Sequence, residues 1–344
     1  MKKDLLEILN CPSCTSTLFS LQQCKVDQIE VRSGSIVCQS CGASYGIESG
    51  IVNFIKDPSQ GVKQEREAMD AEEYITDDKG KRYKINEETI ERFKDKFLSM
   101  PEGDGSHFFR NRGSFQAIAN ISSRVYSTLD GLKLTGKEHI LEIGACFSYA
   151  SFKFAKKGCR VVAIDISNYL KVADLFVKEA YFDRMFCDMH KTPFGDETFD
   201  IIFGSAVLHH SKELSLVFKE MRRILKPDGR LVLINEVARG LFEKVHPIFE
   251  KMQKQGYGDT SYTLTEWQKA AYKGGFKNVR IDFLSLADDY ITRHKNKDLQ
   301  DQDSVKLRLA KFFKTHIILE KCLSFLLIPP RLFFRPKSWK ITCY

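Results

Sequence analysis

Hydrophobic and polar residues alternate in blocks between residues 139 and 236. The apolar blocks expected to be buried strands are HILEIG (139–144), RVVAID (160–165), RMFCD (184–188), FDIIFGS (199–205) and RLVLINE (230–236). Between them, residues 147–157, 169–179 and 214–225 space their apolar side chains at helical intervals. Nearly continuous apolar strands separated by helices indicate a parallel sheet that is covered on both faces. The pattern therefore predicts a doubly wound α/β fold, whose ligands bind at the carboxyl ends of the strands.

Acidic residues stand at the ends of successive predicted strands. The first strand ends in Leu-Glu-Ile-Gly, and Gly144 would let the backbone turn sharply beside a ligand. Asp165 ends the second strand, where a carboxylate can accept both hydroxyls of a ribose. Asp188 ends the third strand and could accept a hydrogen bond from an adenine amino group. Each acid alone could be a helix cap, but together they favour a nucleoside lying across the sheet.

These motifs resemble a known family. LEIGACFS, VVAIDIS, DMHKTPFGDETFDIIFGSAVLHH and RRILKPDGRLVLINE look like class I S-adenosylmethionine-dependent methyltransferases of the type 11, or ubiquinone-methyltransferase-like, group. The resemblance covers about residues 107–285 and implies a seven-stranded, mostly parallel Rossmann-like sheet. It also implies that S-adenosylmethionine contacts Glu142, Gly144, Asp165, Asp188, Met189 and Ser205. A nicotinamide dehydrogenase is disfavoured because the full Gly-x-Gly-x-x-Gly pattern is absent.

The first loop departs from the pattern of this family. Members carry Glu-x-Gly-x-Gly-x-Gly, whereas Cys146 and Ser148 occupy the last two glycine positions here. Two interpretations are open: a subfamily variant that binds the cofactor, or a weakened, non-catalytic site. The retained acids at 165 and 188 favour the variant.

Three side chains are candidates for acid–base chemistry near the transferred methyl group. His209 and His210 follow the fourth strand, and Glu236 ends the fifth. Methyl transfer mainly requires that the nucleophile be placed against the methyl group, and a base helps when the acceptor is a hydroxyl. A histidine can serve because it titrates near neutral pH. The alternative is that the histidine pair only packs the loop.

Two Cys-x-x-Cys pairs lie near the start of the chain. Cys11 and Cys14 form the first pair, and Cys38 and Cys41 form the second. Two such pairs supply four thiolates, which complete the tetrahedral shell of a structural zinc ion. Residues 4–55, with LLEILNCPSC and CQSCGASYGIESGIVNFI, resemble the Trm112-like zinc-ribbon family. Because members of that family activate methyltransferases by docking on them, the resemblance implies a scaffold acting in cis.

Charge is concentrated near the end of the chain. Residues 304–344 hold nine Lys and Arg and one acidic residue, which accounts for the net charge of +8. The neutral remainder argues against a dedicated nucleic-acid binder. Apolar residues at 307–328, followed by basic and aromatic residues that include Trp339, predict either contact with an anionic membrane surface or packing on the protein or a second subunit.

The sequence thus predicts four regions: a zinc ribbon at 1–55, a charged helical linker at 56–106, a methyltransferase domain at 107–285 and a basic amphipathic tail at 286–344. The start of the chain shows no secretory signal, so we expect a cytoplasmic protein that is either free or peripheral to a membrane. We expect methylation of an oxygen or nitrogen on a small molecule, glycan or lipid-linked precursor. An RNA methyltransferase and a non-catalytic interaction protein are the alternatives.

Overall fold

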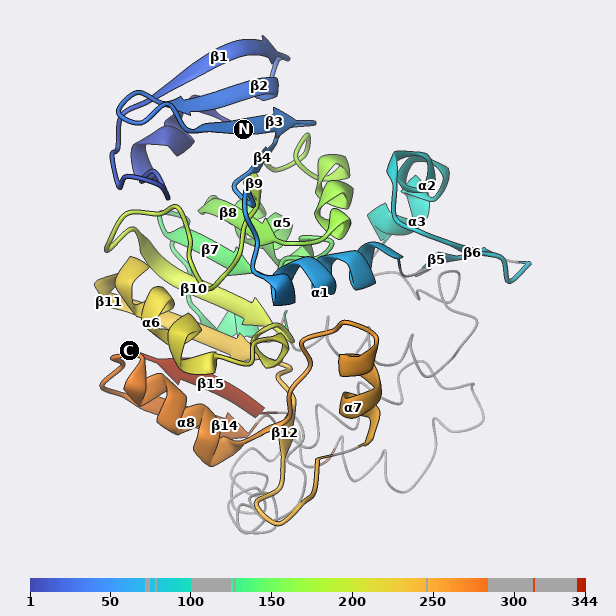
Figure 1. Cartoon of the computed structure of the whole chain (residues 1–344), viewed down its shortest axis with the longest axis vertical. Coiled ribbons are helices and arrows are strands. Elements are labelled where there is room, and N and C mark those ends of the chain that lie inside the picture. Colours follow the sequence, from blue (N-terminus) through green and yellow to red (C-terminus); the bar gives the residue numbers. More distant parts are fainter. Residues whose placement is uncertain are drawn as a thin grey trace.

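The fold is built on one continuous mixed sheet (Figure 1). The computed structural model describes residues 1–71, 75–77, 79–99, 125, 128–245, 247–283, 312 and 339–344. The strands lie in the order β1-β2-β3-β4-β9-β8-β7-β10-β11-β15-β14. Strands β4, β9, β8, β7, β10 and β11 run parallel to one another, and β15 runs antiparallel to both β11 and β14. The predicted mostly parallel, seven-stranded sheet is confirmed. Its strands are β9, β8, β7, β10, β11, β15 and β14, in that order.

Strands and helices alternate along the central region as the apolar blocks predicted. The strands are β7 (His139–Ile143), β8 (Arg160–Asp165), β9 (Asp183–Phe186), β10 (Phe199–Ser205), β11 (Leu225–Ile234) and β14 (Val279–Phe283). The helices are α5 (Tyr149–Lys156), α6 (Leu214–Ile224), α7 (Pro247–Lys254) and α8 (Leu264–Lys273), with 3₁₀ turns η2 (Asn168–Leu175) and η3 (Leu208–His210). Short strands β12 (Ala238–Arg239) and β13 (Tyr262–Thr263) pair with each other. Residues 226–229 interrupt β11, since its pairing with β10 jumps from Leu225 to Arg230.

Hydrophobic clusters cover both faces of the sheet. On one face, α6 buries Leu214, Val217, Phe218, Met221 and Ile224, which recur at the three- and four-residue spacing of a helical stripe. On the other face, α5 and η2 pack Phe154 and Leu170 into a second cluster. Alternation along β7 sends Leu141 and Ile143 to the first cluster and Ile140 to the second. Because both faces are covered, only the ends of the strands remain available to a ligand.

The N-terminal region extends the sheet rather than forming a separate unit. It contains η1 (Lys3–Ile8), β1 (Phe19–Val26), β2 (Val31–Cys38), β3 (Ser44–Glu48) and β4 (Ile51–Asn53). Strand β4 pairs in parallel with β9, and the Asn10 N–H donates to the Pro193 carbonyl at 2.7 Å. The buried guanidinium of Arg184 pairs with Glu30 from this region and with Asp174 at 2.9 Å. The zinc-ribbon region therefore covers the β9 edge of the methyltransferase sheet.

Residues 339–344 lie in the sheet and not in a solvent-exposed tail. Strand β15 (Trp339–Cys343) is inserted between β11 and β14, and Trp339 is 2% exposed, with its ring 5.4 Å from that of Trp267. Residues 339–343 fall in the predicted tail at 286–344, and the structure places them in the sheet, where Trp339, Ile341 and Cys343 are buried. The predicted membrane-facing stretch at 307–328 lies outside the described residues, apart from residue 312. In the part of the chain that the structure describes, no helix is long and apolar enough to cross a membrane.

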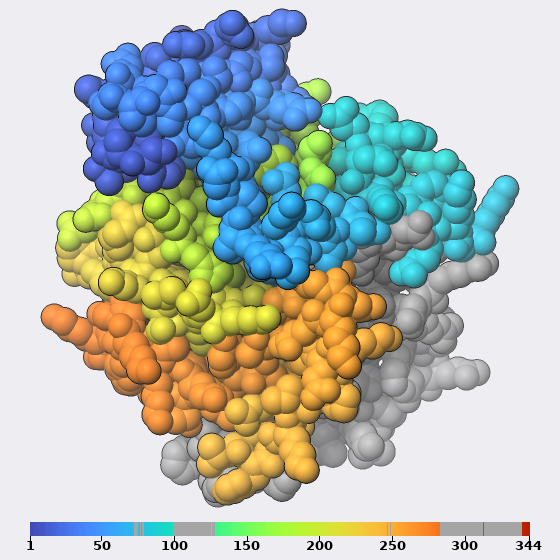
Figure 2. All heavy atoms as spheres, in the orientation of Figure 1, coloured from blue at the N-terminus to red at the C-terminus, as the bar shows by residue number. Residues whose placement is uncertain are grey.

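The segment between the two predicted domains contains structured elements. These are α1 (Gln60–Ala71), β5 (Ile75–Thr76), β6 (Arg82–Tyr83), α2 (Glu87–Arg92) and α3 (Lys94–Ser99). Asn86 caps α2 by accepting a hydrogen bond from the Thr89 N–H at 2.8 Å. In Figures 1 and 2, α1 crosses the front of the molecule between the N-terminal region and the segment around α7.

Candidate functional site

A cavity of about 330 Å³ lies at the carboxyl ends of β7, β8, β9 and β10. Its wall combines the loop after each of these strands with side chains of α1. The sequence-predicted cofactor residues that line it are Glu142, Gly144, Asp165, Asp188, Met189 and Ser205. The structure therefore brings all six predicted residues to one cavity, whose volume is within the usual range for small-molecule sites.

The loop after β7 keeps a glycine-like backbone at three alternate positions. Gly144, Cys146 and Ser148 have φ angles of 62°, 48° and 60°. A Cβ atom at position 144 would lie 2.2 Å from Val207 Cγ2, so only glycine fits there. The side chains at 146 and 148 hold a conformation that costs about 1–2 kcal/mol for a residue other than glycine. At positions 146 and 148 the chain thus differs from the family pattern in its side chains, while the backbone has the left-handed conformation that glycine favours.

Glu142 joins the end of β7 to the start of α5 through hydrogen bonds. Its carboxylate accepts hydrogen bonds from the Ser151 N–H at 2.7 Å and from the Ser151 hydroxyl at 2.5 Å, at the start of α5. The side chain is buried, and burial raises its pKa to about 8 even though the bonds from Ser151 act in the opposite direction. A pKa of about 8 favours the protonated form of Glu142 at neutral pH.

Asp165 joins the ends of β7 and β8. One carboxylate oxygen accepts a hydrogen bond from the Cys146 N–H at 2.8 Å, and the other accepts from the N–H and hydroxyl of Ser167, each at 2.8 Å. Burial raises the pKa of Asp165, and the bonds from Ser167 and Cys146 oppose that rise. These bonds fix the carboxylate at the cavity wall, with lone pairs left for a ligand hydroxyl.

Asp188 is held by its neighbour His190. Asp188 Oδ1 lies 2.9 Å from the His190 N–H and 2.6 Å from His190 Nδ1, while His190 Nε2 lies 2.7 Å from the Ser211 hydroxyl. Burial alone would lower the pKa of His190, but the hydrogen bond and charge of Asp188 raise it. Asp188, Met189 and His190 line the cavity together.

The three predicted acid–base residues differ in whether they line the cavity. Glu236 is buried and accepts hydrogen bonds from the backbone N–H groups of Val207 at 2.9 Å and Leu208 at 3.0 Å, and from His209 Nδ1 at 2.8 Å. Burial would raise the pKa of Glu236, but the bond and charge of His209 lower it. Neither Glu236 nor His209 lines the cavity, whereas His210 does.

His210 faces two carboxylates that the sequence did not single out. Its Nδ1 lies 2.9 Å from Glu65 Oε1 and 3.5 Å from Asp259 Oδ2. Burial disfavours the charged imidazole, but Asp259 and Glu65 outweigh burial and raise the pKa of His210 to about 10. Glu65 was hidden in a charged stretch, and Asp259 lies in a loop with no periodic signal, so only the fold brings them together.

Helix α1 forms one wall of the cavity. Val62, Glu65 and Met69 line it at the three- and four-residue spacing of one helical face. Asp70, near the end of α1, accepts hydrogen bonds from the Asn168 N–H and side-chain amide, each at 2.8 Å. Residues 60–71 lie within the predicted charged helical linker, and the structure shows that they form a helix that lines the cavity.

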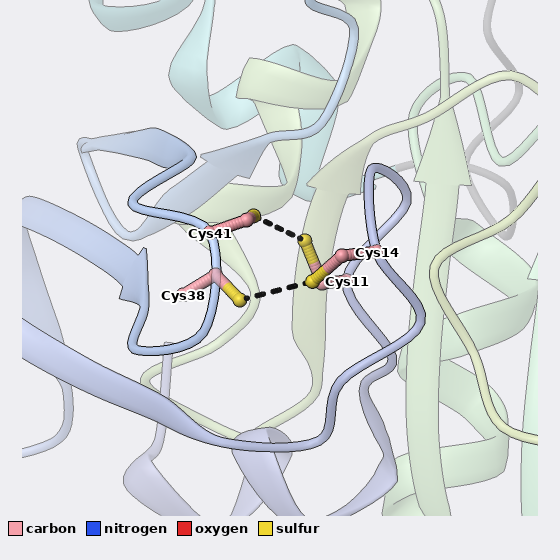
Figure 3. A group of neighbouring side chains, drawn as sticks. All are labelled: Cys11, Cys14, Cys38 and Cys41. Atoms are coloured by element: carbon pink, nitrogen blue, oxygen red, sulfur yellow. Dashed lines mark hydrogen bonds between the residues drawn. The ribbon is translucent and has the colours of Figure 1, made fainter.

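The four cysteines of the N-terminal region converge from two loops (Figure 3). The Sγ atoms of Cys11 and Cys41 are 3.6 Å apart, as are those of Cys14 and Cys38. A zinc ion bound by four thiolates at about 2.3 Å places its sulfur atoms roughly 3.8 Å apart. The four thiols therefore fit a structural zinc ion, and they leave no position open for a substrate.

Known families match the two regions of the chain. A methyltransferase-domain model matches residues 141–233, and a Trm112p-like protein model matches residues 2–50. The chain therefore carries a Trm112p-like region at residues 2–50, followed by a methyltransferase domain at residues 141–233.

Individual relatives are distant. The chain is similar to glycine/sarcosine/dimethylglycine N-methyltransferase of Actinopolyspora halophila, with 24% identity over 57% of this chain and 35% of that protein. It is 26% identical to malonyl-[acyl-carrier protein] O-methyltransferase of Serratia marcescens, over 48% of this chain and 64% of that protein. The chain thus spans between about one third and two thirds of these relatives.

Solved structures share the fold. Geranyl diphosphate C-methyltransferase from Streptomyces coelicolor A3(2), solved with S-adenosyl-L-homocysteine among its ligands, has a TM-score of 0.50 and 12% identity. The match covers 83% of this chain and 97% of that one. At this identity the likeness shows the fold alone.

Proposed function

We propose that the cavity binds S-adenosylmethionine and that the protein transfers its methyl group to an oxygen or nitrogen of a small-molecule, glycan or lipid-linked acceptor. The observation that carries this proposal is the placement of Glu142, Asp165 and Asp188 around one cavity from three strand ends. When bound, the cofactor supplies an electrophilic methyl group on a sulfonium. Asp165 would hold the ribose hydroxyls, Asp188 with Met189 the adenine, and the loop at 142–144 the methionine end.

The acceptor is proposed to enter beside Ser205 and His210. Ser205 ends β10, and its hydroxyl accepts a hydrogen bond from the Asn235 amide at 2.9 Å. Of the three predicted acid–base residues, only His210 lines the cavity, so we assign the acceptor contact to it. His209 and Glu236 are proposed as positioning residues, because their bonds hold the loop that carries His210 and neither reaches the cavity. Alignment of the acceptor against the methyl group would then supply most of the rate enhancement.

The zinc-ribbon region is proposed to act in cis as a scaffold. It pairs with β9, the strand that leads to Asp188, and it supplies no residue to the cavity wall. Its contribution to methyl transfer would therefore be to hold β9 in register rather than to bind the acceptor.

Calorimetry with the purified full-length chain tests the cofactor proposal. We expect S-adenosylmethionine and S-adenosylhomocysteine to bind with one site, and labelled S-adenosylmethionine to mark the acceptor in an extract. Absence of binding by both compounds would favour the non-catalytic interaction protein that the side chains at 146 and 148 first suggested. Label transferred to RNA would favour the RNA alternative, with affinity that falls as salt rises.

A further inference from the structure

Two histidines and two carboxylates meet beside the cavity, on its Ser205 side. We propose that His209, His210 and Asp259 bind a divalent first-row transition-metal ion, with Glu65 next to His210. The residues come from η3, from the loop between α7 and β13, and from α1. The ligand atoms of His209, His210 and Asp259 already lie within 4.8 Å of one another. This site is separate from the four cysteines, and it does not depend on the proposed methyl transfer.

The second ring nitrogen of His209 faces this cluster. Glu236 accepts hydrogen bonds from backbone N–H groups, so its carboxylate is held as an acceptor and pairs with His209 Nδ1. The other ring nitrogen, Nε2, lies 3.8 Å from Asp259 Oδ1. That separation is too long for a hydrogen bond. A carboxylate that orients the far nitrogen of a histidine in this way is the usual outer partner of a metal-bound imidazole.

Asp259 contributes the strongest independent evidence for a ligand. Its side chain is 5% exposed, and among the described residues its Oδ2 atom accepts no hydrogen bond, although His210 Nδ1 lies 3.5 Å away. His210 Nδ1 is likewise buried without a well-directed hydrogen bond, although Glu65 Oε1 is 2.9 Å from it. Buried polar atoms are rarely left in this state, and an ion bound between the two residues would satisfy both.

The spacing of these atoms suits one ion. His209 Nε2 lies 3.8 Å from Asp259 Oδ1, and His210 Nδ1 lies 3.5 Å from Asp259 Oδ2. Two ligands at about 2.0–2.2 Å from one tetrahedral zinc ion are roughly 3.3–3.6 Å apart, so these two distances require shifts of only a few tenths of an ångström. Two neutral imidazoles and two carboxylates also balance a charge of +2. Mixed nitrogen and oxygen ligands favour a transition ion over calcium or magnesium, which prefer oxygen alone.

The loop that carries Asp259 is fixed before any ion arrives. The Thr260 N–H donates to the His209 carbonyl at 2.7 Å, and the Gln253 amide donates to the Asp259 carbonyl at 2.7 Å. A Cβ atom at Gly258 would lie 2.0 Å from the His210 carbonyl oxygen, so the loop approaches η3 as closely as glycine allows. His210 and Glu65 border the cavity, which gives an ion an entry path and an open position toward a bound molecule.

Zinc content of the full-length protein tests the proposal. After equilibrium dialysis against micromolar zinc, elemental analysis should find two zinc ions per wild-type chain. Asp259→Asn and Glu65→Gln should each lose one ion. Asp70→Asn is the matched control on α1 and should keep both ions, because Asp70 contacts Asn168 instead. Cys38→Ser with Cys41→Ser should lose the other ion.

Two results would overturn the proposal. One is a single zinc ion in the wild type that disappears with the cysteine substitutions. The other is two ions that persist in both Asp259→Asn and Glu65→Gln, which would place the second ion elsewhere. Melting curves of each variant separate loss of an ion from loss of folding. Because the readout is metal content, a failed methyl-transfer assay leaves the result unaffected.

Discussion

Asp165 Oδ2 accepts a hydrogen bond from the Cys146 backbone N–H at 2.8 Å, so the end of β8 holds the loop after β7 in place. Asp165→Asn keeps the shape of the side chain but removes its charge. We expect S-adenosylmethionine affinity to fall by at least about tenfold, since a hydrogen bond to a charged group contributes about 1.5–3 kcal/mol. Calorimetry measures the change, and the Asp228→Asn variant, in the interrupted segment of β11, is the control. Equal affinity of Asp165→Asn and wild type would remove Asp165 from the site.

Left-handed backbone at Cys146 and Ser148 makes glycine the better residue at both positions. Cys146→Gly and Ser148→Gly should each stabilise the protein by roughly 0.5–1 kcal/mol, because relief of strain exceeds the entropy that glycine adds to the unfolded chain. Denaturant unfolding measures the effect. Ser148→Ala is the matched control, since it removes the buried hydroxyl but keeps the Cβ atom. Stabilisation by alanine as large as that by glycine would show that strain is not the cause.

The raised pKa of Glu142 makes stability depend on pH. Its folded pKa of about 8 is above the ordinary value of 4.5, so the folded protein holds the proton more tightly than the unfolded chain. This contribution to stability is complete below about pH 4.5 and is lost as the pH rises through about 8. Between pH 6 and pH 8.5, wild type should lose on the order of 2–3 kcal/mol more than Glu142→Gln. Parallel unfolding profiles for the two proteins would contradict the assignment.

Zinc at the four cysteines should stabilise the central sheet as well as the N-terminal region, because β4 pairs in parallel with β9. Chelation, or Cys11→Ser, should lower the melting temperature of the full chain before it affects cofactor binding at low temperature. Cys24→Ser serves as the control, since Cys24 lies outside the cluster of four. Melting that is unchanged by chelation would argue against a structural ion.

Trp339 should be essential to the sheet. Trp339→Ala is expected to cost about 3–5 kcal/mol, because a fully buried aromatic side chain in contact with Trp267 is removed. Trp339→Phe should cost much less, since the indole Nε1 of Trp339 has no hydrogen-bond partner among the described residues. Urea unfolding of the two variants distinguishes them. A mild effect of alanine would mean that β15 is dispensable.

The sequence was sufficient to predict a site residue where one strand and the loop after it determine the position of that residue. Asp165 and Asp188 could be placed from apolar runs that end in an acid, and the four cysteines from their spacing. Glu65 and Asp259 could not be placed, because their role depends on α1 and the 256–260 loop docking against η3. The strand at Trp339 was not predicted, because WKITC follows basic and aromatic residues and its partners β11 and β14 are distant in sequence. Non-local pairing of this kind leaves no periodic trace.

The position of β15 has a consequence for the order of events during synthesis. After Phe283 the chain leaves β14 and returns only at Trp339 to fill the gap between β14 and β11. Until residues 339–343 leave the ribosome, β11 presents an open edge of unpaired backbone groups, and such edges attract other chains. Folding of the central sheet must therefore finish after most of the polypeptide has emerged. An exposed edge of this kind favours aggregation of the nascent chain.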